Sequence, residues 1–508
     1  MLYLKKKLLS IFCLINLFVL KVRAQEVYHE QYRLQIHFSP KEHWVNDPNG
    51  MVFYDSIYHL FFQYYPGGTT WGPMHWGHAT STDLIHWQEQ PVALYPDSLG
   101  YIFSGSAVVD KHNTSGLGAN GKVPLVAIYT SHDPVGEKAG RNDYQNQSIA
   151  YSLDNGRTWE KFSANPVLKN PGITDFRDPK VMWYKPGKKW VMTLATKDRI
   201  TFFSSPDLKN WKKESEFGVG IGAHGGVWEC PDLFSLDYNG KKIWVLVVNL
   251  NPGGPNKGSA TQYFLGDFDG NKFTPLDTET KWLDYGPDEY AGITWSNTGD
   301  RKIFIGWMSN WMYASKVPSS KWRNAMTIPR ELHLKKIKKE LYVASNPVYD
   351  LKKIEIHTDS VTDKVILKKI DITSFIKTGI TLPCRLDLNL KDLNDLSIIV
   401  SNDSGEKLII GYEKKLNHYF IDRTLSGKVD FNEGFAAKRA APRLSKTANM
   451  DFSIILDESS VELFADNGLS VMTEIFFPEN PYNKIEIEPN KKVSFKKIQY
   501  TSLKSIWK

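Results

Sequence analysis

The sequence predicts an all-β protein in which a β-propeller is followed by a C-terminal β-sandwich. Short runs of β-forming residues bounded by turn residues recur along the chain, and helical periodicity is almost absent. A turn motif returns every 50 to 70 residues or so, which is typical of propeller blades. Fifteen of the sixteen tryptophans lie between Trp44 and Trp322, which indicates two domains of different character. The length of 508 residues also favours two domains over one.

Residues 1–24 have the three parts of a secretory signal. Residues 5–7 are lysines, residues 8–20 are mostly apolar, and residues 22–24 (Val-Arg-Ala) are similar to a signal cleavage site. The apolar stretch of about thirteen residues is shorter than the roughly 20 residues that cross a bilayer. We therefore expect a mature chain that begins near Gln25, is secreted or periplasmic, and has no membrane anchor.

The first domain is predicted to contain repeated four-stranded units. In the repeated turn an Asp caps its own turn and a following aromatic residue packs into the next strand, as at Asp83, Asp154 and Asp207. Independent hairpins in a sandwich are the alternative, but the spacing suits a four-stranded sheet each time. A weaker copy of the turn lies at 267–273, and the clearest strand segments are 58–64, 190–194, 243–248 and 303–307.

After Asp350 the pattern changes to strands in which apolar and polar residues alternate, which predicts a β-sandwich. The boundary is expected near the basic and polar run at 335–340 or just after Pro347, where a linker would be solvated. We place the boundary so that residues 25–345 form the propeller and residues 346–508 form the sandwich. The predicted sandwich strands are 386–390, 396–401, 407–411, 452–456 and 461–465.

Charge and cysteine content exclude several classes of function. The net charge is +7, but five Lys or Arg residues and no acidic residue lie in 1–24, which leaves +2 for the mature chain. The mature chain has no basic patch of the kind that would indicate a nucleic-acid partner. Only Cys230 and Cys384 follow the signal, so the sequence has no disulfide framework and no paired Cys/His spacing for a metal. We expect both to be buried free thiols, and one disulfide between them is the alternative.

Two aspartates lie in Pro-marked turns. Asp47 belongs to the segment Trp-Val-Asn-Asp-Pro-Asn-Gly, and Asp178 belongs to Phe-Arg-Asp-Pro-Lys. Each segment makes a good turn by itself, so a structural role is the alternative. In both, the following Pro favours an extended backbone for the Asp, which would aim the carboxylate off the end of a strand.

A third carboxylate, Glu229, lies between Trp228 and the pair Cys230-Pro231. Apolar surroundings disfavour the charged form of a carboxyl group, so we expect Glu229 to be a proton donor. A buried structural ion pair is the alternative. The trio suits glycoside hydrolysis, in which one acid protonates the leaving oxygen while a carboxylate attacks or stabilises the cationic sugar.

Aromatic and polar side chains near these acids suit sugar binding, because sugar rings present apolar faces and hydroxyl groups. The candidates for hydrogen bonds are Asn46, Gln63 and Arg177. Most of the tryptophans could equally belong to the core. The candidates for stacking are Trp44, Trp71, Trp76, Trp228, Trp307 and Trp311.

These segments resemble glycoside hydrolase family 32, which includes invertases, inulinases and levanases, over nearly the whole mature chain. In this resemblance Asp47 matches the nucleophile, Asp178 the transition-state stabiliser and Glu229 the acid/base, in the family's order and approximate spacing. Val45 stands where methionine is usual. Further similar segments are 76–79, 284–288, 328–332, 459–464 and Phe103-Ser104-Gly105-Ser106, which adds Phe103 and Ser104 to the substrate-binding candidates.

The resemblance implies a five-bladed propeller with a central pocket, and retaining hydrolysis of β-fructofuranosidic bonds with no cofactor and no metal. Asp47 would attack the anomeric carbon while Glu229 protonates the leaving sugar. Asp178, beside Arg177, would remain ionised and bind ring hydroxyls as positive charge develops. Water would then hydrolyse the fructosyl-enzyme, with Glu229 acting as base.

The substrate is expected to be a fructan or sucrose. Segment 224–233 is more similar to exo-acting levanases and inulinases than to plant or yeast invertases, so we expect release of terminal fructose from levan or inulin, with sucrose also cleaved. An endo-levanase and an invertase are the nearest alternatives. A fructosyltransferase needs the same carboxylates. A non-catalytic fructan-binding protein is disfavoured, because binding requires no proton donor.

Overall fold

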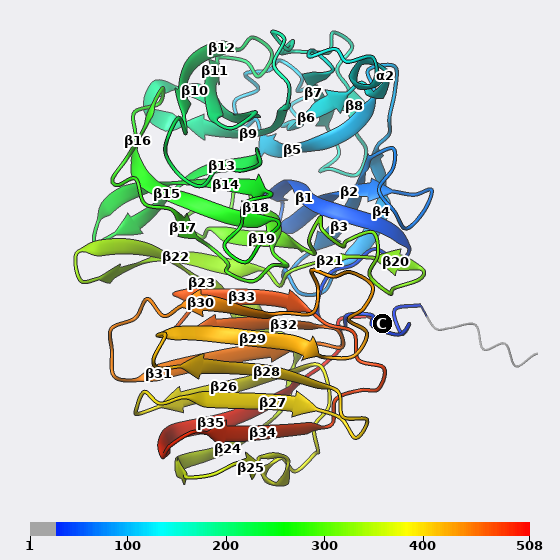
Figure 1. Cartoon of the computed structure of the whole chain (residues 1–508). Helices are drawn as coiled ribbons and strands as arrows, with labels where there is room; N and C mark the ends of the chain where they lie inside the picture. Colours follow the sequence, from blue (N-terminus) through cyan, green and yellow to red (C-terminus); the bar gives the residue numbers. More distant parts are fainter. Residues whose placement is uncertain (1–26, 508) are drawn as a thin grey trace, which may run out of the picture.

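The computed structural model describes residues 27–507, so the predicted signal segment 1–24 lies outside the described residues. Across residues 27–507 the strands form five sheets of four or five strands and two sheets of six strands. The five smaller sheets are the blades of a propeller, in the upper part of Figure 1, and the two larger sheets form the C-terminal sandwich below it. The predicted fold class is confirmed, including the five blades that the family resemblance implied.

Each blade begins with the strand nearest the propeller axis, and these five first strands contact one another in a closed ring. Blade 1 contains β1 (His43–Tyr54), β2 (Ile57–Tyr65), β3 (His75–Ser81) and β4 (Gln88–Leu94), with β20 (Trp322–Arg323) paired to β1 in parallel. Blade 2 contains β5 (Tyr101–Val109), β6 (Leu125–His132), α2 (Pro134–Lys138), β7 (Gln145–Ser152) and β8 (Glu160–Lys161). Blade 3 contains β9 (Phe176–Tyr184), η1 (Lys185–Gly187), β10 (Lys189–Thr196), β11 (Ile200–Ser205) and β12 (Lys212–Phe217).

The last two blades complete the ring. Blade 4 contains β13 (Val227–Tyr238), β14 (Lys241–Asn251), β15 (Ala260–Phe268), β16 (Phe273–Pro275) and β17 (Lys281–Trp282). Blade 5 contains β18 (Tyr290–Thr294), β19 (Ile303–Met308), β21 (Ala325–Met326), β22 (Arg330–Ile337) and β23 (Glu340–Pro347). The four strand segments predicted for this domain lie in β2, β10, β14 and β19, which are the second strands of blades 1, 3, 4 and 5.

The repeated turn connects the third and fourth strands in each of the first four blades. In blade 3, Asp207 Oδ1 accepts hydrogen bonds from the N–H groups of Lys209 and Asn210, at 3.0 and 2.8 Å. Asp83 caps the equivalent turn of blade 1 in the same way. The carboxylate thus accepts hydrogen bonds from backbone N–H groups that the turn would otherwise leave unpaired, as the sequence motif predicted.

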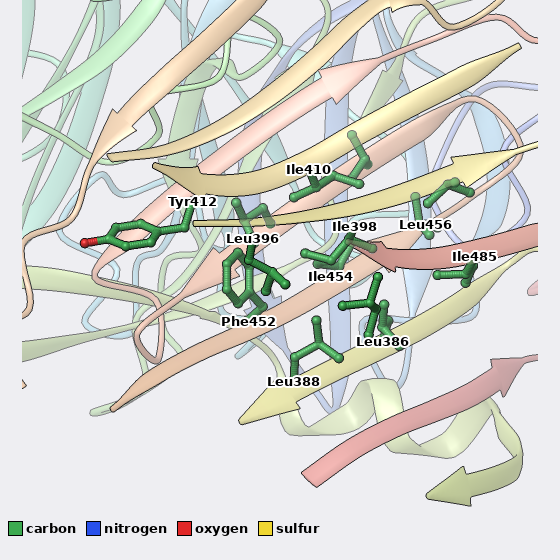
Figure 2. Close-up of a cluster of buried hydrophobic side chains, with 14 of the residues drawn as sticks. Leu386, Leu388, Leu396, Ile398, Ile410, Tyr412, Phe452, Ile454, Leu456 and Ile485 are labelled. Atoms are coloured by element: carbon green, nitrogen blue, oxygen red, sulfur yellow. The ribbon is translucent and has the colours of Figure 1, made fainter. Parts of the chain in front are cut away.

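The sandwich packs two sheets face to face over a core to which both contribute. Alternating residues of β26 and β27, such as Leu386, Leu388 and Ile398, are fully buried between the sheets (Figure 2). One sheet contains β24 (Glu355–Ile366), β35 (Val493–Leu503), β26 (Cys384–Leu390), β31 (Met450–Leu456), β32 (Ser460–Ala465) and β33 (Ser470–Ile475). The other contains β25 (Ile370–Asp371), β34 (Lys484–Pro489), β27 (Leu396–Ser401), β28 (Lys407–Glu413), β29 (His418–Leu425) and β30 (Lys438–Pro442). The short helix η2 (Tyr349–Ile354) precedes β24, and η3 (Thr373–Phe375) lies between β25 and β26.

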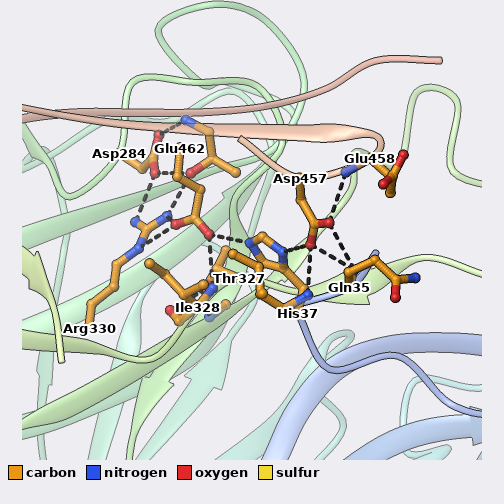
Figure 3. A network of polar contacts seen from close by, with 12 residues as sticks. Gln35, His37, Asp284, Thr327, Ile328, Arg330, Asp457, Glu458 and Glu462 are labelled. Carbon is orange, nitrogen blue, oxygen red and sulfur yellow. Dashed lines mark hydrogen bonds and ion pairs between the residues drawn. The ribbon is translucent and has the colours of Figure 1, made fainter. Parts of the chain in front are cut away.

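A buried polar network joins the two domains (Figure 3). Arg330 of the propeller donates to Asp284 Oδ2 at 2.9 Å and, through Nε at 3.0 Å, to Glu462 Oε2 of the sandwich. The ring of His37 contacts Glu462 at 2.8 Å and Asp457 at 2.7 Å. Three of the family-like segments therefore meet at the domain interface.

The interpretation of the cysteines is confirmed, since Cys230 and Cys384 are both free and buried. Among residues 27–507, no helix is long and apolar enough to span a membrane.

Candidate active site

The three predicted carboxylates lie near the beginning of three inner strands. Asp47 is on β1, Asp178 on β9 and Glu229 on β13, so all three reach the same end of the propeller axis. Register shifts follow Val45 in β1 and Glu229 in β13. Such bulges re-aim side chains and are common next to active sites.

One backbone expectation is wrong. Asp178 has a φ of 63° and is not extended, although a proline follows it. The β9–β10 ladder has a register shift beside this segment, and the irregular backbone directs the N–H of Asp178 to the hydroxyl of Thr130, at 3.0 Å. The local preference set by proline is overridden by contacts with a neighbouring blade.

Asp47 is held by donors on both oxygens. Ser104 donates to Oδ2 at 2.7 Å, and the Asn46 amide donates to Oδ1 at 3.0 Å. The thiol of Cys230 lies 3.5 Å from Oδ2. Burial raises the pKa of Asp47, and the negative charge of Glu229 raises it further.

Asp178 is 5% exposed and faces the same cysteine. Its Oδ2 accepts a hydrogen bond from the Cys230 N–H at 3.0 Å and lies 3.7 Å from the Cys230 thiol. Burial raises the pKa of Asp178 to about 7; Arg177 opposes this shift, and the negative charges of Glu229 and Asp47 add to it.

Glu229 has polar partners that the sequence did not predict. Arg177 donates to its Oε1 from Nε at 3.2 Å and from Nη2 at 2.9 Å, and the hydroxyl of Tyr290 donates to its Oε2. The Arg177 Nε is farther from Asp178, at 3.9 Å. Arg177 therefore contacts the predicted proton donor more closely than the carboxylate beside it in sequence.

Trp228 and Cys230, the neighbours of Glu229 in sequence, do not form the apolar surroundings that were expected for its carboxyl group. Trp228 is fully buried among the side chains between blades 3 and 4, and its indole donates to the Ala223 carbonyl at 3.0 Å. The Cys230 thiol faces Asp47 and Asp178. Because side chains alternate along a strand, Trp228 points away from Glu229.

The predicted binding residues separate into two groups. Asn46, Ser104 and Arg177 contact the carboxylates. Trp71 is 42% exposed, and its ring packs edge-on against Phe103 with centroids 6.2 Å apart. These residues leave polar atoms and an aromatic surface near the three acids.

The other candidates support the site from behind. Trp44 and Trp307 are fully buried; the Trp44 indole donates to Asn46 Oδ1 at 2.8 Å, and the Trp307 indole donates to the Val45 carbonyl at 3.0 Å. Gln63 is 2% exposed and donates to the carbonyl of Ile102. These contacts hold the Asp47 and Phe103 segments, and sugar contact by the three side chains stays a prediction. Trp76 is also buried, and Trp311 is half-buried against Trp44 and Trp307.

Tyr290, Thr130 and the backbone N–H of Cys230 were missed by the sequence analysis. Tyr290 lies two residues after the family-like segment 284–288, but nothing in that segment indicates contact with Glu229. Within residues 27–507, no cluster of His, Cys, Asp and Glu side chains has the arrangement of a metal site. The chemistry that the site offers is that of three close carboxylates with one arginine, one tyrosine and one thiol.

Comparison with known proteins identifies the family. The profile "Glycosyl hydrolases family 32 N-terminal domain" matches residues 37–345, and "Glycosyl hydrolases family 32 C terminal" matches residues 349–502. A levanase of Bacillus subtilis (strain 168) is 43% identical over 99% of this chain and 76% of its own length. An extracellular exo-inulinase of Aspergillus niger is 42% identical over 89% of this chain and 91% of its own length.

A solved structure of a fructofuranosidase from Schwanniomyces occidentalis, complexed with fructosylnystose, has the same fold. Its TM-score is 0.86 at 32% identity, and the match covers 94% of this chain and 99% of that chain. The matched profiles and relatives span both domains. The chain therefore belongs to glycoside hydrolase family 32 and is a glycoside hydrolase of the β-fructofuranosidase type.

Proposed function

We propose that this chain is a retaining exo-fructanase that releases terminal fructose from levan or inulin and also cleaves sucrose. Asp47 is the nucleophile, Glu229 the acid/base and Asp178 the stabiliser of the sugar cation. The observation that carries this assignment is the convergence of the three carboxylates from β1, β9 and β13 around Arg177 and Cys230.

In the first step Asp47 attacks the anomeric carbon of the terminal fructosyl unit, and Glu229 gives its proton to the leaving oxygen. Hydrogen bonds from Ser104 and Asn46 hold the Asp47 carboxylate in one orientation, which favours attack from a fixed position. Arg177 and Tyr290 hold Glu229 by both oxygens. In the second step water hydrolyses the fructosyl-enzyme, and Glu229 takes the proton of that water.

Positive charge develops on the sugar ring in both transition states, and this explains why the carboxylates are buried together. Close negative charges are unfavourable in the free enzyme, and a cationic sugar between them relieves that repulsion. Asp178 is tied to the Cys230 N–H and is therefore pre-oriented toward the ring. Binding is strongest when the charge on the sugar is largest.

The substrate assignment rests on similarity to a levanase and to an extracellular exo-inulinase over nearly the whole chain. The fructosylnystose complex of the Schwanniomyces enzyme supports a fructosyl oligosaccharide as ligand. The exposed ring of Trp71 against Phe103 supports an aromatic contact for a sugar at the rim of the site. The extracellular relative and the predicted signal support a secreted or periplasmic enzyme.

The test is incubation of residues 25–508 with levan, inulin and sucrose, with products followed over time by chromatography. Fructose alone from the earliest samples supports the exo-acting assignment, whereas oligosaccharides that appear first would indicate an endo-levanase. Asp47→Ala should abolish release, and Glu229→Gln should abolish turnover but retain binding. Asp198→Asn, a surface carboxylate that is 48% exposed, is the matched control and should keep wild-type activity. No release from any of the three sugars would contradict the proposal.

A further inference from the structure

A buried ion pair lies one layer further along the strands that carry the catalytic carboxylates. Lys180 Nζ is 3.2 Å from Asp232 Oδ2, and the two side chains are 9% and 1% exposed. Lys180 also donates to the carbonyl of Thr294. The N–H and hydroxyl of Thr294 donate to Asp232 Oδ2 at 2.6 and 2.7 Å. These three residues, the axial triad, join β9, β13 and β18.

Two members of the axial triad share a strand direction with an active-site side chain, Lys180 with Arg177 and Asp232 with Glu229. Lys180 lies three residues after Arg177, and the register shift of β9 between them gives both side chains the same direction. Asp232 lies three residues after Glu229, which would place it on the opposite side of a regular strand. The bulge between Glu229 and Asp232 restores the common direction. Asp178, Cys230 and Lys180 also line one cavity of about 10 Å³.

Blades 3, 4 and 5 need such a link because no backbone ladder joins them. Within the described residues their inner strands belong to three separate sheets. The contacts of Glu229 cross the same two boundaries, since Arg177 is on β9 and Tyr290 is on β18. A shift of one blade along the axis would therefore separate Glu229 from Arg177 or from Tyr290.

We propose that Lys180, Asp232 and Thr294 are positioning residues that fix the relative height of these blades, so that Glu229 faces Arg177 and Tyr290. This inference rests on the proposed function of Glu229 as acid/base. At this buried position, apolar side chains of similar volume would stabilise the folded protein as well as an ion pair does. An ion pair with two further hydrogen bonds differs from them in fixing direction and distance.

The test compares two variants with the wild type on sucrose. Lys180→Met/Asp232→Asn removes both charges and keeps a carbonyl that accepts from Thr294, and Thr294→Val removes only the hydroxyl donor. At a temperature where circular dichroism shows fully folded protein, we expect kcat to fall about tenfold or more while KM changes less than about threefold. Lys180→Arg keeps the charge and should recover part of the loss.

Lys281→Met is the matched control, because Lys281 is another buried lysine that pairs with an aspartate, Asp277, but lies at β17 away from the inner strands. It should lower the melting temperature and leave kcat unchanged. Folded axial-triad variants with wild-type kcat and a lower melting temperature would overturn the inference, since that result describes a purely structural pair. If the double variant does not fold, the kcat and melting temperature of Thr294→Val and Lys180→Arg decide between a positioning role and a purely structural one. A wild type that releases no fructose would remove the proposed function, and this inference with it.

Discussion

At the scale of single residues, the site concentrates negative charge around one arginine. Arg177 Nη2 lies 2.9 Å from Glu229, and its Nε lies 3.9 Å from Asp178. Burial and mutual repulsion raise the pKa of both Asp47 and Asp178. The free enzyme therefore holds its carboxylates in an unfavourable arrangement, and a developing cation on the sugar makes that arrangement favourable.

Removing the charge of Asp178 should stabilise the folded protein while it abolishes activity. The folded pKa of Asp178, about 7, lies above its usual value of 3.8, so wild-type stability falls as pH rises from about 4 through 7. The asparagine of Asp178→Asn does not titrate. The free energy of unfolding of this variant should therefore exceed that of the wild type by an amount that grows to about 1–2 kcal/mol between pH 5 and pH 8. Denaturant unfolding at both pH values measures the difference, with Asp198→Asn as control. An advantage that shrinks with rising pH would contradict the raised pKa.

Tyr290→Phe should lower kcat about tenfold, because it removes one hydrogen bond to Glu229, the proposed acid/base. The ring remains, so the packing of β18 should be kept. Steady-state kinetics on sucrose and a melting curve measure the two effects. Tyr313→Phe is the matched control: Tyr313 also donates to a buried carboxylate, Asp288, but at the domain interface. That variant should lose stability and keep kcat; an equal loss of kcat in both would argue against a specific role for Tyr290.

That Asp47, Asp178 and Glu229 lie close together could be predicted from sequence, but their partners could not. Asp47, Asp178 and Glu229 each lie in a short segment whose neighbouring residues mark it. The contacts of Glu229 with Arg177 and Tyr290 span 52 and 61 residues and depend on closure of the ring of blades. The same limit explains the tryptophans: Trp44 of β1 and Trp307 of β19 are buried against each other, which residue type alone does not reveal.

At the scale of elements, the local signals predicted the strands and turns well. The segments at 396–401 and 58–64 correspond to β27 and β2, because alternation and turn residues are short-range properties. The left-handed Asp178 and the parallel pairing of β20 with β1 were not predicted. Both depend on contacts between segments that are distant in sequence, which override or add to local preference.

The capped turns should contribute stability without affecting catalysis. Asp207 accepts from two backbone N–H groups and from the Asn210 side chain, at the outer side of blade 3. Asp207→Ala leaves these donors without their partner, and we expect a loss of about 1–2 kcal/mol in the free energy of unfolding. Denaturant unfolding measures the loss, with Lys212→Ala on the adjacent strand, 78% exposed, as the control. Wild-type stability in Asp207→Ala would show that the turn forms without its cap.

At the scale of the whole molecule, buried charges hold the sandwich against the propeller. Arg330 and Arg423 from the two domains each reach carboxylates across the boundary, and His37 joins Asp457 to Glu462. Breaking such a buried pair from one side costs about 3–5 kcal/mol, because the remaining charge is left uncompensated. The family-like segments around Asp284, Arg330 and Glu462 thus keep the domains together, a role that their sequence alone did not reveal.

This interface should weaken as pH rises above neutrality. Burial raises the pKa of Glu289 and of Glu474 to about 8. Near neutral pH the folded protein therefore keeps protons on these two groups that the unfolded chain has lost. Their contribution is present near pH 4.5 and is lost as pH rises through 8. Contacts with Asp457 and Glu462 outweigh burial and raise the pKa of His37 to about 9, so its contribution is complete below pH 6.5 and is lost as pH rises through 9. The loss of a proton from each of these three groups lowers the stability of the folded protein as pH rises.

Glu289→Gln should therefore make the alkaline decline in stability shallower. The amide has nearly the same shape as the protonated acid and does not titrate, so the variant loses only the contributions of Glu474 and His37 between pH 6.5 and pH 9. Melting temperatures at half-unit steps across this range, compared with those of the wild type, measure the slope. Glu433→Gln, on an exposed side chain, is the control and should follow the wild type. If Glu289→Gln declines as steeply as the wild type, Glu289 is already ionised in the folded protein, and the alkaline weakening belongs to His37 and Glu474.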